Sequence, residues 1–129
     1  MRSSQHFQIC DASGKSVVVE YVDDEMKVVY PDKNYQCATN FLLTNPDAEF
    51  NFGQDRYQII DEKLNSSNGV LTSHEAMQLL SDCSQDAHKN KQGKISKTQW
   101  SCVYDLKKKR VTICVNQNYD TEYSINVVE

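Results

Sequence analysis

The sequence lacks the features that mark several classes of protein. No apolar run approaches the ~20 residues that span a bilayer, and the first residues lack the apolar core of a signal peptide. Lys and Arg number 14 against 18 Asp and Glu, so the net charge is −4. That charge gives no electrostatic reason to expect nucleic acid or a membrane surface as a partner. We therefore expect a cytoplasmic protein that binds neither.

Motifs for metals, phosphates and redox chemistry are also missing. The five cysteines form no Cys-x-x-Cys pair, and there is no His-Glu-x-x-His motif and no glycine-rich phosphate loop. His6, His74 and His88 do not have the spacing of metal ligands. We expect no metal and no cofactor, and we interpret the cysteines as reduced and mostly buried.

Strand patterns occupy the two ends of the chain and helical patterns the middle. Valine-rich Ser16–Val22, the segment Tyr35–Leu43 and the alternating segment Thr98–Leu106 are predicted strands. Helices are predicted near Gln54–Leu64 and Ser73–Ser84. In Thr98–Leu106 the alternation places Trp100, Cys102 and Tyr104 on one side.

Strands set apart from a helical block indicate an α+β fold with antiparallel pairing. With 129 residues, 39% of them hydrophobic, the chain is long enough for one domain, which we expect to span residues 1–129. The prediction is an antiparallel sheet carrying both helices on one face. Five side chains of the helices should contact that sheet: Ile60, Leu64, Ala76, Leu80 and Cys83.

Two polar groups in less polar surroundings are candidates for chemistry. Thr39-Asn40 lies inside an apolar segment, where the amide could satisfy buried backbone groups or donate to a developing oxyanion. Asp55-Arg56-Tyr57 lies near a helix start. Its guanidinium could pair with its neighbours or could face a substrate carbonyl or carboxylate. The pattern alone favours the structural interpretation at both places.

Five segments together resemble the choloylglycine hydrolase and penicillin V acylase-like family of linear amide C–N hydrolases. Their order and spacing run across nearly the whole chain. The segments are His6-Phe7 with Asp11–Gly14 and Ser16–Glu20, Ala38-Thr39-Asn40-Phe41, Asp55-Arg56-Tyr57, Ser73-His74-Glu75-Ala76, and Thr98–Ser101 with Val103-Tyr104-Asp105.

The resemblance implies a four-layer αββα sandwich of the N-terminal nucleophile class, of which this chain supplies roughly the C-terminal half. Such proteins cleave small linear amides, or transfer the acyl group, with an N-terminal cysteine whose own amine is the base. By resemblance, Asn40 helps to hold the oxyanion and Arg56 lies close to the nucleophile.

The sequence departs from that family at its start. It begins Met1-Arg2-Ser3, with no cysteine for the role of nucleophile. We therefore expect a fragment or truncated form that does not hydrolyse amides alone. The alternatives are a non-catalytic module for binding or assembly that kept half of the sandwich, and an unrelated α+β binding domain.

Half of a sandwich leaves apolar sheet surface or strand edges without cover. The strand has apolar side chains on both faces, Val17, Val19 and Tyr21 on one and Val18 and Val22 on the other. We therefore expect both faces to be buried. We expect a homo-oligomer, most simply a two-fold dimer, with sheet residues in its interface.

Overall fold

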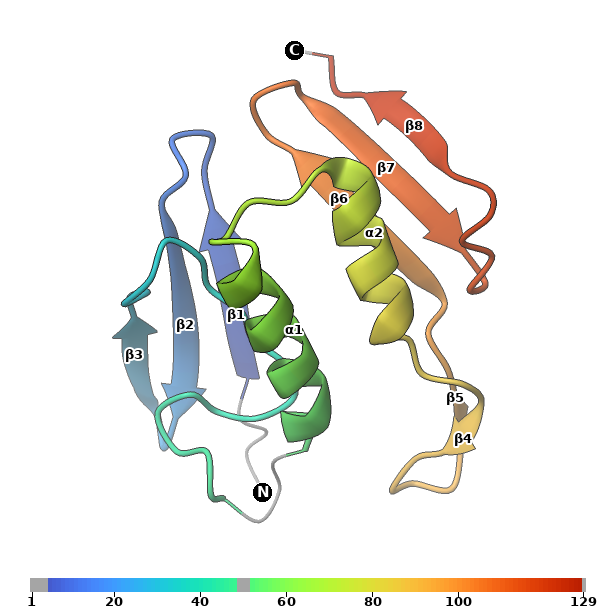
Figure 1. Ribbon diagram of the computed structural model, residues 1–129. Coiled ribbons are helices and arrows are strands. Elements are labelled where there is room, and N and C mark those ends of the chain that lie inside the picture. Colours follow the sequence, from blue (N-terminus) through green and yellow to red (C-terminus); the bar gives the residue numbers. More distant parts are fainter. Residues whose placement is uncertain (1–4, 49–51, 129) are drawn as a thin grey trace. The chain divides into compact units, whose positions relative to one another are not determined.

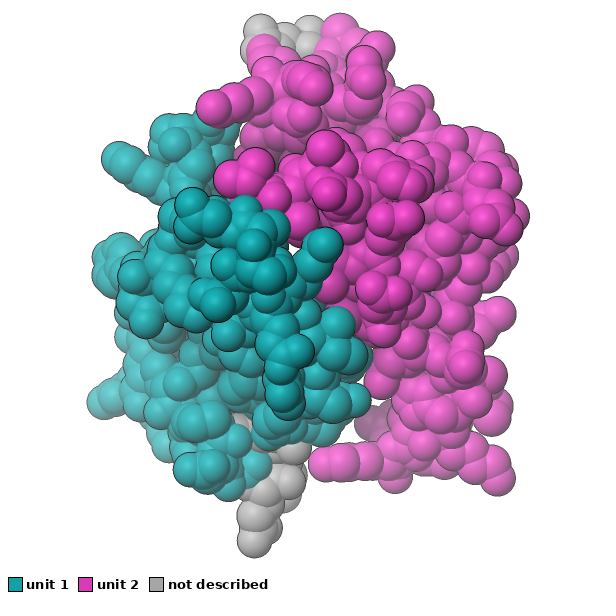
Figure 2. All heavy atoms as spheres, in the orientation of Figure 1, with its two compact units in different colours: residues 1–69 teal, residues 70–129 magenta. Residues whose placement is uncertain are grey.

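The computed structural model describes residues 5–48 and 52–128. The chain divides into two compact units, unit 1 (Met1–Gly69) and unit 2 (Val70–Glu129), coloured separately in Figure 2. The expectation of one domain over residues 1–129 stays a prediction. Within the described ranges, no helix is long and apolar enough to cross a membrane.

The described residues of unit 1 form three strands and one helix (Figure 1). Strands β1 (Gln5–Cys10), β2 (Ser16–Val22) and β3 (Glu25–Val29) form an antiparallel sheet in the order β1-β2-β3, and helix α1 spans Gln54–Ser66. The predicted valine strand is thus confirmed and lies in the middle of its sheet. A central strand favours β-branched residues because both of its edges are paired and its faces are half buried.

Local side-chain and backbone chemistry sets the two hairpins of unit 1. The Asp11 carboxylate accepts from the Ser13 backbone N–H at 2.8 Å, the Ser13 hydroxyl at 2.6 Å and the Lys15 N–H at 3.3 Å. The β2–β3 turn uses Asp23 and Asp24, whose φ angles are 52° and 66°. Two consecutive left-handed residues match the twist of antiparallel strands, and aspartate tolerates this conformation.

The sheet of unit 1 is covered on one face only. On β2, Val18, Glu20 and Val22 are buried, whereas Tyr21 on the opposite face is 50% exposed. Cross-strand register places apolar residues of all three strands beside one another on that opposite face. These residues form the unit 1 apolar face: Phe7, Ile9, Val17, Val19, Tyr21, Met26 and Val28.

The prediction of a strand at Tyr35–Leu43 is wrong, because this segment is irregular. Side-chain hydrogen bonds, and not strand pairing, connect it to the sheet. The Gln36 amide accepts from the Ser16 hydroxyl at 2.9 Å and donates to the Val29 carbonyl at 2.9 Å, and the Gln8 amide donates to the Gln36 carbonyl at 2.9 Å. Backbone groups satisfied in this way do not need a neighbouring strand.

Unit 2 contains one helix, a small hairpin and a three-stranded antiparallel sheet in the order β6-β7-β8. Helix α2 (Ser73–Asp82) begins with the expected capping box, in which the Thr72 hydroxyl accepts from the Glu75 N–H and the Glu75 carboxylate accepts from the Thr72 N–H. The strands are β4 (His88–Lys89), β5 (Ile95–Ser96), β6 (Trp100–Asp105), β7 (Arg110–Val115) and β8 (Tyr123–Asn126).

Helix α2 packs against β6 and lies across this sheet (Figure 1). Its buried residues are Met77, 1% exposed, and Leu79, and the buried residues of β6 and β7 are Ser101, Thr112 and Cys114. Small side chains on the sheet leave room for the long, flexible side chain of Met77. The residues that are buried in the sheet are therefore small ones.

The α+β class, the antiparallel pairing and both helices are confirmed, with two differences in detail. The strands form three separate sheets, and each helix belongs to a different unit. Helix α1 has no fully buried residue, and the expected contact residues Ile60 and Leu64 are half buried. In α2, burial centres on Met77, and the expected Ala76, Leu80 and Cys83 are half buried.

The predicted alternation in β6 is confirmed, but its large apolar side chains face away from the buried side. Trp100 pairs with Val115 and Tyr104 with Val111, and Val111 pairs in turn with Ile125. Trp100 is 67% exposed and Tyr104 62%. The unit 2 apolar face consists of Trp100, Cys102, Tyr104, Val111, Ile113, Val115, Tyr123 and Ile125.

Candidate functional site

The structure brings the two predicted site residues together. Asn40 lies in the irregular segment after β3, and Arg56 lies in the first turn of α1. The Arg56 guanidinium Nη2 donates to the Asn40 side-chain oxygen Oδ1 at 2.6 Å. Their proximity is as expected, although Asn40 is exposed and lies outside any strand. The catalytic roles of both residues stay predictions.

This hydrogen bond determines which way the Asn40 amide points. A guanidinium has five donors and no acceptor, so only the oxygen of the amide can face it. The Nδ2 group, with two N–H donors, must then lie on the other side of the amide. The contact with Arg56 therefore presents Asn40 as a hydrogen-bond donor to whatever lies beyond it.

Gly53, at the N-cap of α1, lies close to both Arg56 and Asn40. Its φ of 91° is left-handed, and an added Cβ would lie 2.7 Å from Arg56 Nη2 and 3.2 Å from the backbone nitrogen of Asn40. The Thr39 hydroxyl donates to the Gly53 carbonyl at 2.8 Å, and the Phe52 N–H donates to the Asn40 carbonyl at 3.2 Å. A glycine is needed here because both its conformation and its surroundings disfavour a side chain.

A buried carboxylate anchors the segment that follows Asn40. Glu20 is fully buried in β2, where its Oε1 accepts from the Leu43 N–H at 2.6 Å. Its Oε2 accepts from the Thr44 N–H at 3.0 Å and from the Thr44 hydroxyl at 2.6 Å. Burial disfavours the ionised form, but these hydrogen bonds outweigh burial and lower the pKa of Glu20. His6 Nδ1 lies 3.6 Å from the same carboxylate.

Glu20 and Gly53 are site residues that the sequence analysis missed. The sequence did contain one signal for Glu20. It is the only charged residue in a valine-rich strand, and alternation places it on the same face as Val18 and Val22, which are buried. A carboxylate at a core position must find donors, so its parity indicated an anchoring role. For Gly53, no signal in the sequence separates it from an ordinary helix-start glycine.

Beside the pair lies a second group, in which Cys37 and Tyr57 are neighbours. Burial raises the pKa of the Cys37 thiol and raises that of Tyr57 to about 12. Both therefore stay protonated at neutral pH, and Cys37 is a poor nucleophile. The Tyr57 ring also packs edge-on against Phe41, with centroids 5.1 Å apart. These contacts fix the α1 turn that carries Arg56.

Among its described residues, unit 1 has concave regions, two of which bear on the site. One, of about 480 Å³, includes Cys37 and Tyr57 with the polar group Lys33, Tyr35 and Asp61. There the Lys33 ammonium and the Tyr35 hydroxyl both donate to the Asp61 carboxylate, at 3.3 and 2.8 Å. Neither region is lined by Asn40 or Arg56. The common cleft expected for that pair therefore stays a prediction.

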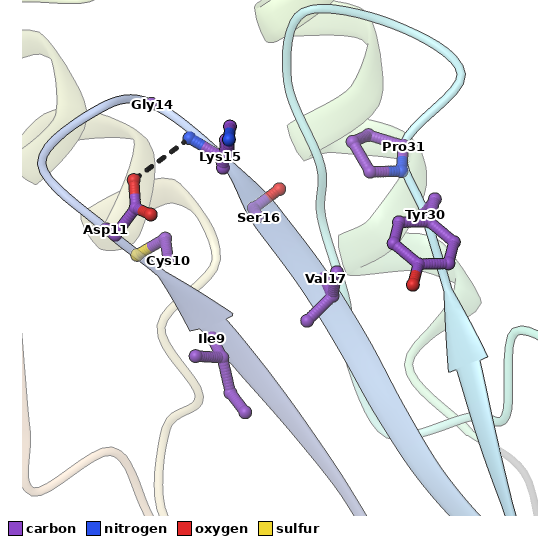
Figure 3. A pocket seen from close by; sticks show the side chains of 9 residues that line it. All are labelled: Ile9, Cys10, Asp11, Gly14, Lys15, Ser16, Val17, Tyr30 and Pro31. Atoms are coloured by element: carbon purple, nitrogen blue, oxygen red, sulfur yellow. Dashed lines mark hydrogen bonds between the residues drawn. The ribbon is translucent and has the colours of Figure 1, made fainter.

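The other region, of about 540 Å³, lies at the end of the β1–β2 hairpin (Figure 3). Ile9 of β1 and Val17 of β2 are cross-strand neighbours, and Tyr30 and Pro31 follow the end of β3 (Figure 3). It is an extension of the unit 1 apolar face and offers mainly apolar contact. Among residues 5–48 and 52–128, no group of three or more His, Cys, Asp or Glu side chains is placed to hold a metal ion.

Comparisons with known proteins define the family. The family model described as acyl-coenzyme A:6-aminopenicillanic acid acyl-transferase matches residues 1–120, so the chain belongs to that family. No curated protein matches. Among solved structures, a mutant of the conjugated bile acid hydrolase from Clostridium perfringens is similar, with a TM-score of 0.64 and 16% identity over 94% of this chain.

The resemblance to linear amide hydrolases with the N-terminal nucleophile fold is thereby confirmed. The match covers 49% of the bile acid hydrolase chain, so this chain spans about half the length of that structure. At 16% identity the structural likeness concerns the fold alone. Met1, Arg2 and Ser3, on which the expected absence of a nucleophile was based, lie outside the described residues.

Proposed function

We propose that this chain forms the part of a linear amide C–N hydrolase that binds the oxyanion, with Asn40 as donor and Arg56 as its positioning partner. The observation that carries the proposal is the 2.6 Å hydrogen bond between Arg56 Nη2 and Asn40 Oδ1. It joins residues 16 positions apart, from a loop and a helix, into one rigid group. Membership in an acyl-transferase family supports the proposal.

The chemistry follows from the direction of that bond. Attack on an amide carbonyl places negative charge on its oxygen, and a fixed N–H donor stabilises this charge more than it stabilises the neutral amide. Asn40 Nδ2 is such a donor because Arg56 holds the other end of the amide. The cationic guanidinium adds a favourable field for the same charge. The substrate class is a small linear amide of the bile-salt, penicillin or N-acyl type.

We also propose that the nucleophile comes from outside these 129 residues, which makes the chain a fragment or truncated form in function. Burial raises the pKa of Cys37 and Cys114, which makes both thiols poor nucleophiles. Cys10 is exposed, but as an internal residue at the end of β1 it has no α-amine of its own to act as base. The proposal also places the chain in the cytoplasm, where cysteines stay reduced.

The first expected result is catalytic silence of the isolated chain. Purified protein should release no amine from a conjugated bile salt or penicillin V above a buffer blank, because the proposal places the nucleophile and its own amine base outside these 129 residues. Amine release is measured with an amine-reactive dye. Turnover that disappears in Cys10→Ala or Cys37→Ala would show that an internal thiol is the nucleophile and would contradict this part of the proposal.

A second experiment tests Asn40 itself. The chain is co-expressed with the polypeptide encoded directly upstream in its genome, and amine release is assayed. We expect activity that Asn40→Ala lowers about 100-fold or more, the usual effect of removing one oxyanion donor. The matched control Asn126→Ala changes an exposed asparagine of β8 and should leave the rate unchanged. Activity that is insensitive to Asn40→Ala, or upstream DNA without a coding sequence, counts against the proposal.

One observation favours a second function, that of a non-catalytic binding or assembly module. Both three-stranded sheets expose an apolar face, with Phe7, Ile9 and Met26 all more than half exposed in unit 1. Extended apolar surface of this kind serves contact with another macromolecule. A stable complex that forms without any amide turnover would favour this second function.

A further inference from the structure

The hairpin of β4 and β5 concentrates positive charge in a chain that is acidic overall. Residues 88–97, which we call the lysine arm, contain no carboxylate and four lysines: Lys89, Lys91, Lys94 and Lys97. All four lysines are exposed, whereas the net charge of the whole chain is −4. The arm extends past the C-terminal end of α2 (Figure 1). Its charge therefore differs in sign from that of the whole chain.

Hydrogen bonds hold the lysine arm at its base and at its tip. At the base, the Gln85 N–H donates to the Thr98 hydroxyl at 2.8 Å, and the Thr98 N–H donates to the Gln85 carbonyl at 2.9 Å. At the tip, the Asn90 side-chain oxygen accepts from the backbone N–H groups of Gln92 and Lys94, at 2.9 and 3.0 Å. The backbone that carries the lysines is thus ordered before any partner arrives, which lowers the entropic cost of binding.

Three ammonium groups of the lysine arm are available to a partner. Among the described residues, the ion pairs include none of Lys89, Lys94 and Lys97. The β6–β7 turn, which is the other basic cluster of unit 2, differs in this respect. There Lys108 Nζ lies 3.9 Å from an oxygen of the Asp105 carboxylate. The arm is therefore the better place to attract an anion from outside.

The residue types of the lysine arm distinguish between anionic partners. The arm has no aromatic side chain to stack on a nucleic-acid base and no arginine for bidentate contact with phosphate. Its one large apolar side chain, Ile95, is 68% exposed, and a single such side chain is too little to anchor a protein in a lipid surface. Both strands are edges of a two-stranded sheet, and an extended polypeptide can pair with an edge. An acidic polypeptide therefore fits both the charge and the edges.

We propose that the lysine arm binds an extended acidic segment of another polypeptide, which adds as a strand to the β4–β5 hairpin. Lys89 and Ile95 are cross-strand partners and lie on the same face of the hairpin. A segment in which carboxylates alternate with small uncharged side chains matches that face. The proposal concerns neither Asn40 nor Arg56, so it does not depend on the proposed hydrolase function.

A labelled peptide tests the charge requirement. The probe is a fluorescein-labelled peptide in which glutamate alternates with threonine, and its control has glutamine in place of glutamate. Fluorescence anisotropy with the full chain should show that only the glutamate peptide binds. Its dissociation constant should rise about 10-fold or more between ~0.01 M and ~0.15 M salt, because the Debye length falls from ~30 Å to ~8 Å. Equal affinity for the two peptides, or no binding of the glutamate peptide in low salt, overturns the proposal.

Two triple variants then locate the site. The arm variant replaces three lysines of the arm: Lys89→Gln, Lys94→Gln and Lys97→Gln. The turn variant replaces the three lysines of the β6–β7 turn: Lys107→Gln, Lys108→Gln and Lys109→Gln. Both variants remove the same charge, and circular dichroism checks that both fold. The arm variant should weaken peptide binding about 10-fold or more and the turn variant less than about 2-fold. Equal weakening means that the peptide responds only to overall charge, and the proposal is then wrong.

Two further measurements test the class of partner and the mode of binding. A DNA duplex and vesicles that contain phosphatidylserine should each bind more weakly than the glutamate peptide at the same salt concentration. Tighter binding of either one identifies a nucleic acid or a membrane as the partner and overturns the proposal. In an amide NMR spectrum, the peptide should shift the signals of Lys89 and Ile95 and leave those of β8, an edge strand without lysine, unchanged. Shifts in β8 and none in the arm would also contradict the proposal.

Discussion

Replacement of Glu20 by glutamine should lower the free energy of unfolding by about 2–4 kcal/mol, although the two side chains have nearly the same shape. The carboxylate accepts three hydrogen bonds, one from the Leu43 N–H and two from the Thr44 N–H and hydroxyl. A glutamine would turn an NH₂ donor toward one of these donors. The buried group would lose its hydrogen bonds on that side and leave the loop donors unsatisfied.

Urea denaturation at neutral pH measures this change, and Glu25→Gln is the matched control. Glu25 is exposed at the start of β3, so its substitution should change stability by about 0.5 kcal/mol or less. Equal effects of the two substitutions would show that Glu20 does not anchor the segment after Asn40.

The pH dependence has a definite sign because the folded protein lowers the pKa of Glu20 from its usual 4.5. A carboxyl with a lowered pKa binds fewer protons in the folded state than in the unfolded state. Its contribution is complete above pH 4.5 and is lost as the pH falls through the folded-state value. The stability difference between wild type and Glu20→Gln should therefore shrink below pH 4.5. Parallel stability curves would contradict this account.

Sequence periodicity predicted the regular elements well and the irregular ones poorly. Ser16–Val22 and Thr98–Leu106 show strand alternation over a long enough stretch, and the structure has β2 and β6 there. Tyr35–Leu43 also looked like a strand, but side-chain hydrogen bonds hold it in place of strand pairing. The Gln36 amide donates to the Val29 carbonyl, and the Glu20 carboxylate accepts from the Leu43 N–H. Such bonds link residues more than six positions apart, so no local pattern reveals them.

Alternation also does not say which face of a strand is covered. In β6 it separated Trp100, Cys102 and Tyr104 from Ser101 correctly. It left open which of the two sides is the core. The structure buries Ser101, in the strand against which α2 packs, and leaves Trp100 exposed. What covers the other side depends on a second polypeptide layer, about which a single strand carries no information.

For the site, the pairing of Asn40 with Arg56 was expected from family resemblance and not from spacing. The two residues are 16 positions apart, and the described residues 41–48 between them form no regular helix or strand. Local chemistry could have identified Glu20 through its parity on β2. It could not have identified Gly53, since the need for glycine there comes from Arg56 and Asn40 and not from the turn alone.

Substitution of Gly53 by alanine should therefore lower stability and also separate Arg56 from Asn40. Alanine at a φ of 91° is strained, which costs on the order of 1–2 kcal/mol. Its methyl group would lie 2.7 Å from Arg56 Nη2, so the guanidinium must move. The backbone nitrogen of Asn40, at 3.2 Å, must also give way slightly. Together we expect a loss of about 2–3 kcal/mol and a broken Arg56–Asn40 hydrogen bond.

Gly14 provides the control that separates strain from crowding. Its φ of 87° is nearly the same as that of Gly53, but an added Cβ would have no atom within 4 Å. Gly14→Ala should therefore cost only the strain, about 1–2 kcal/mol, and leave the Asn40 side-chain amide signals in an NMR spectrum unchanged. Gly53→Ala should cost more and shift those signals, because Asn40 Oδ1 loses its donor. Equal costs in the two variants, with unchanged Asn40 signals in both, would mean that Gly53 serves the turn alone and does not position the pair.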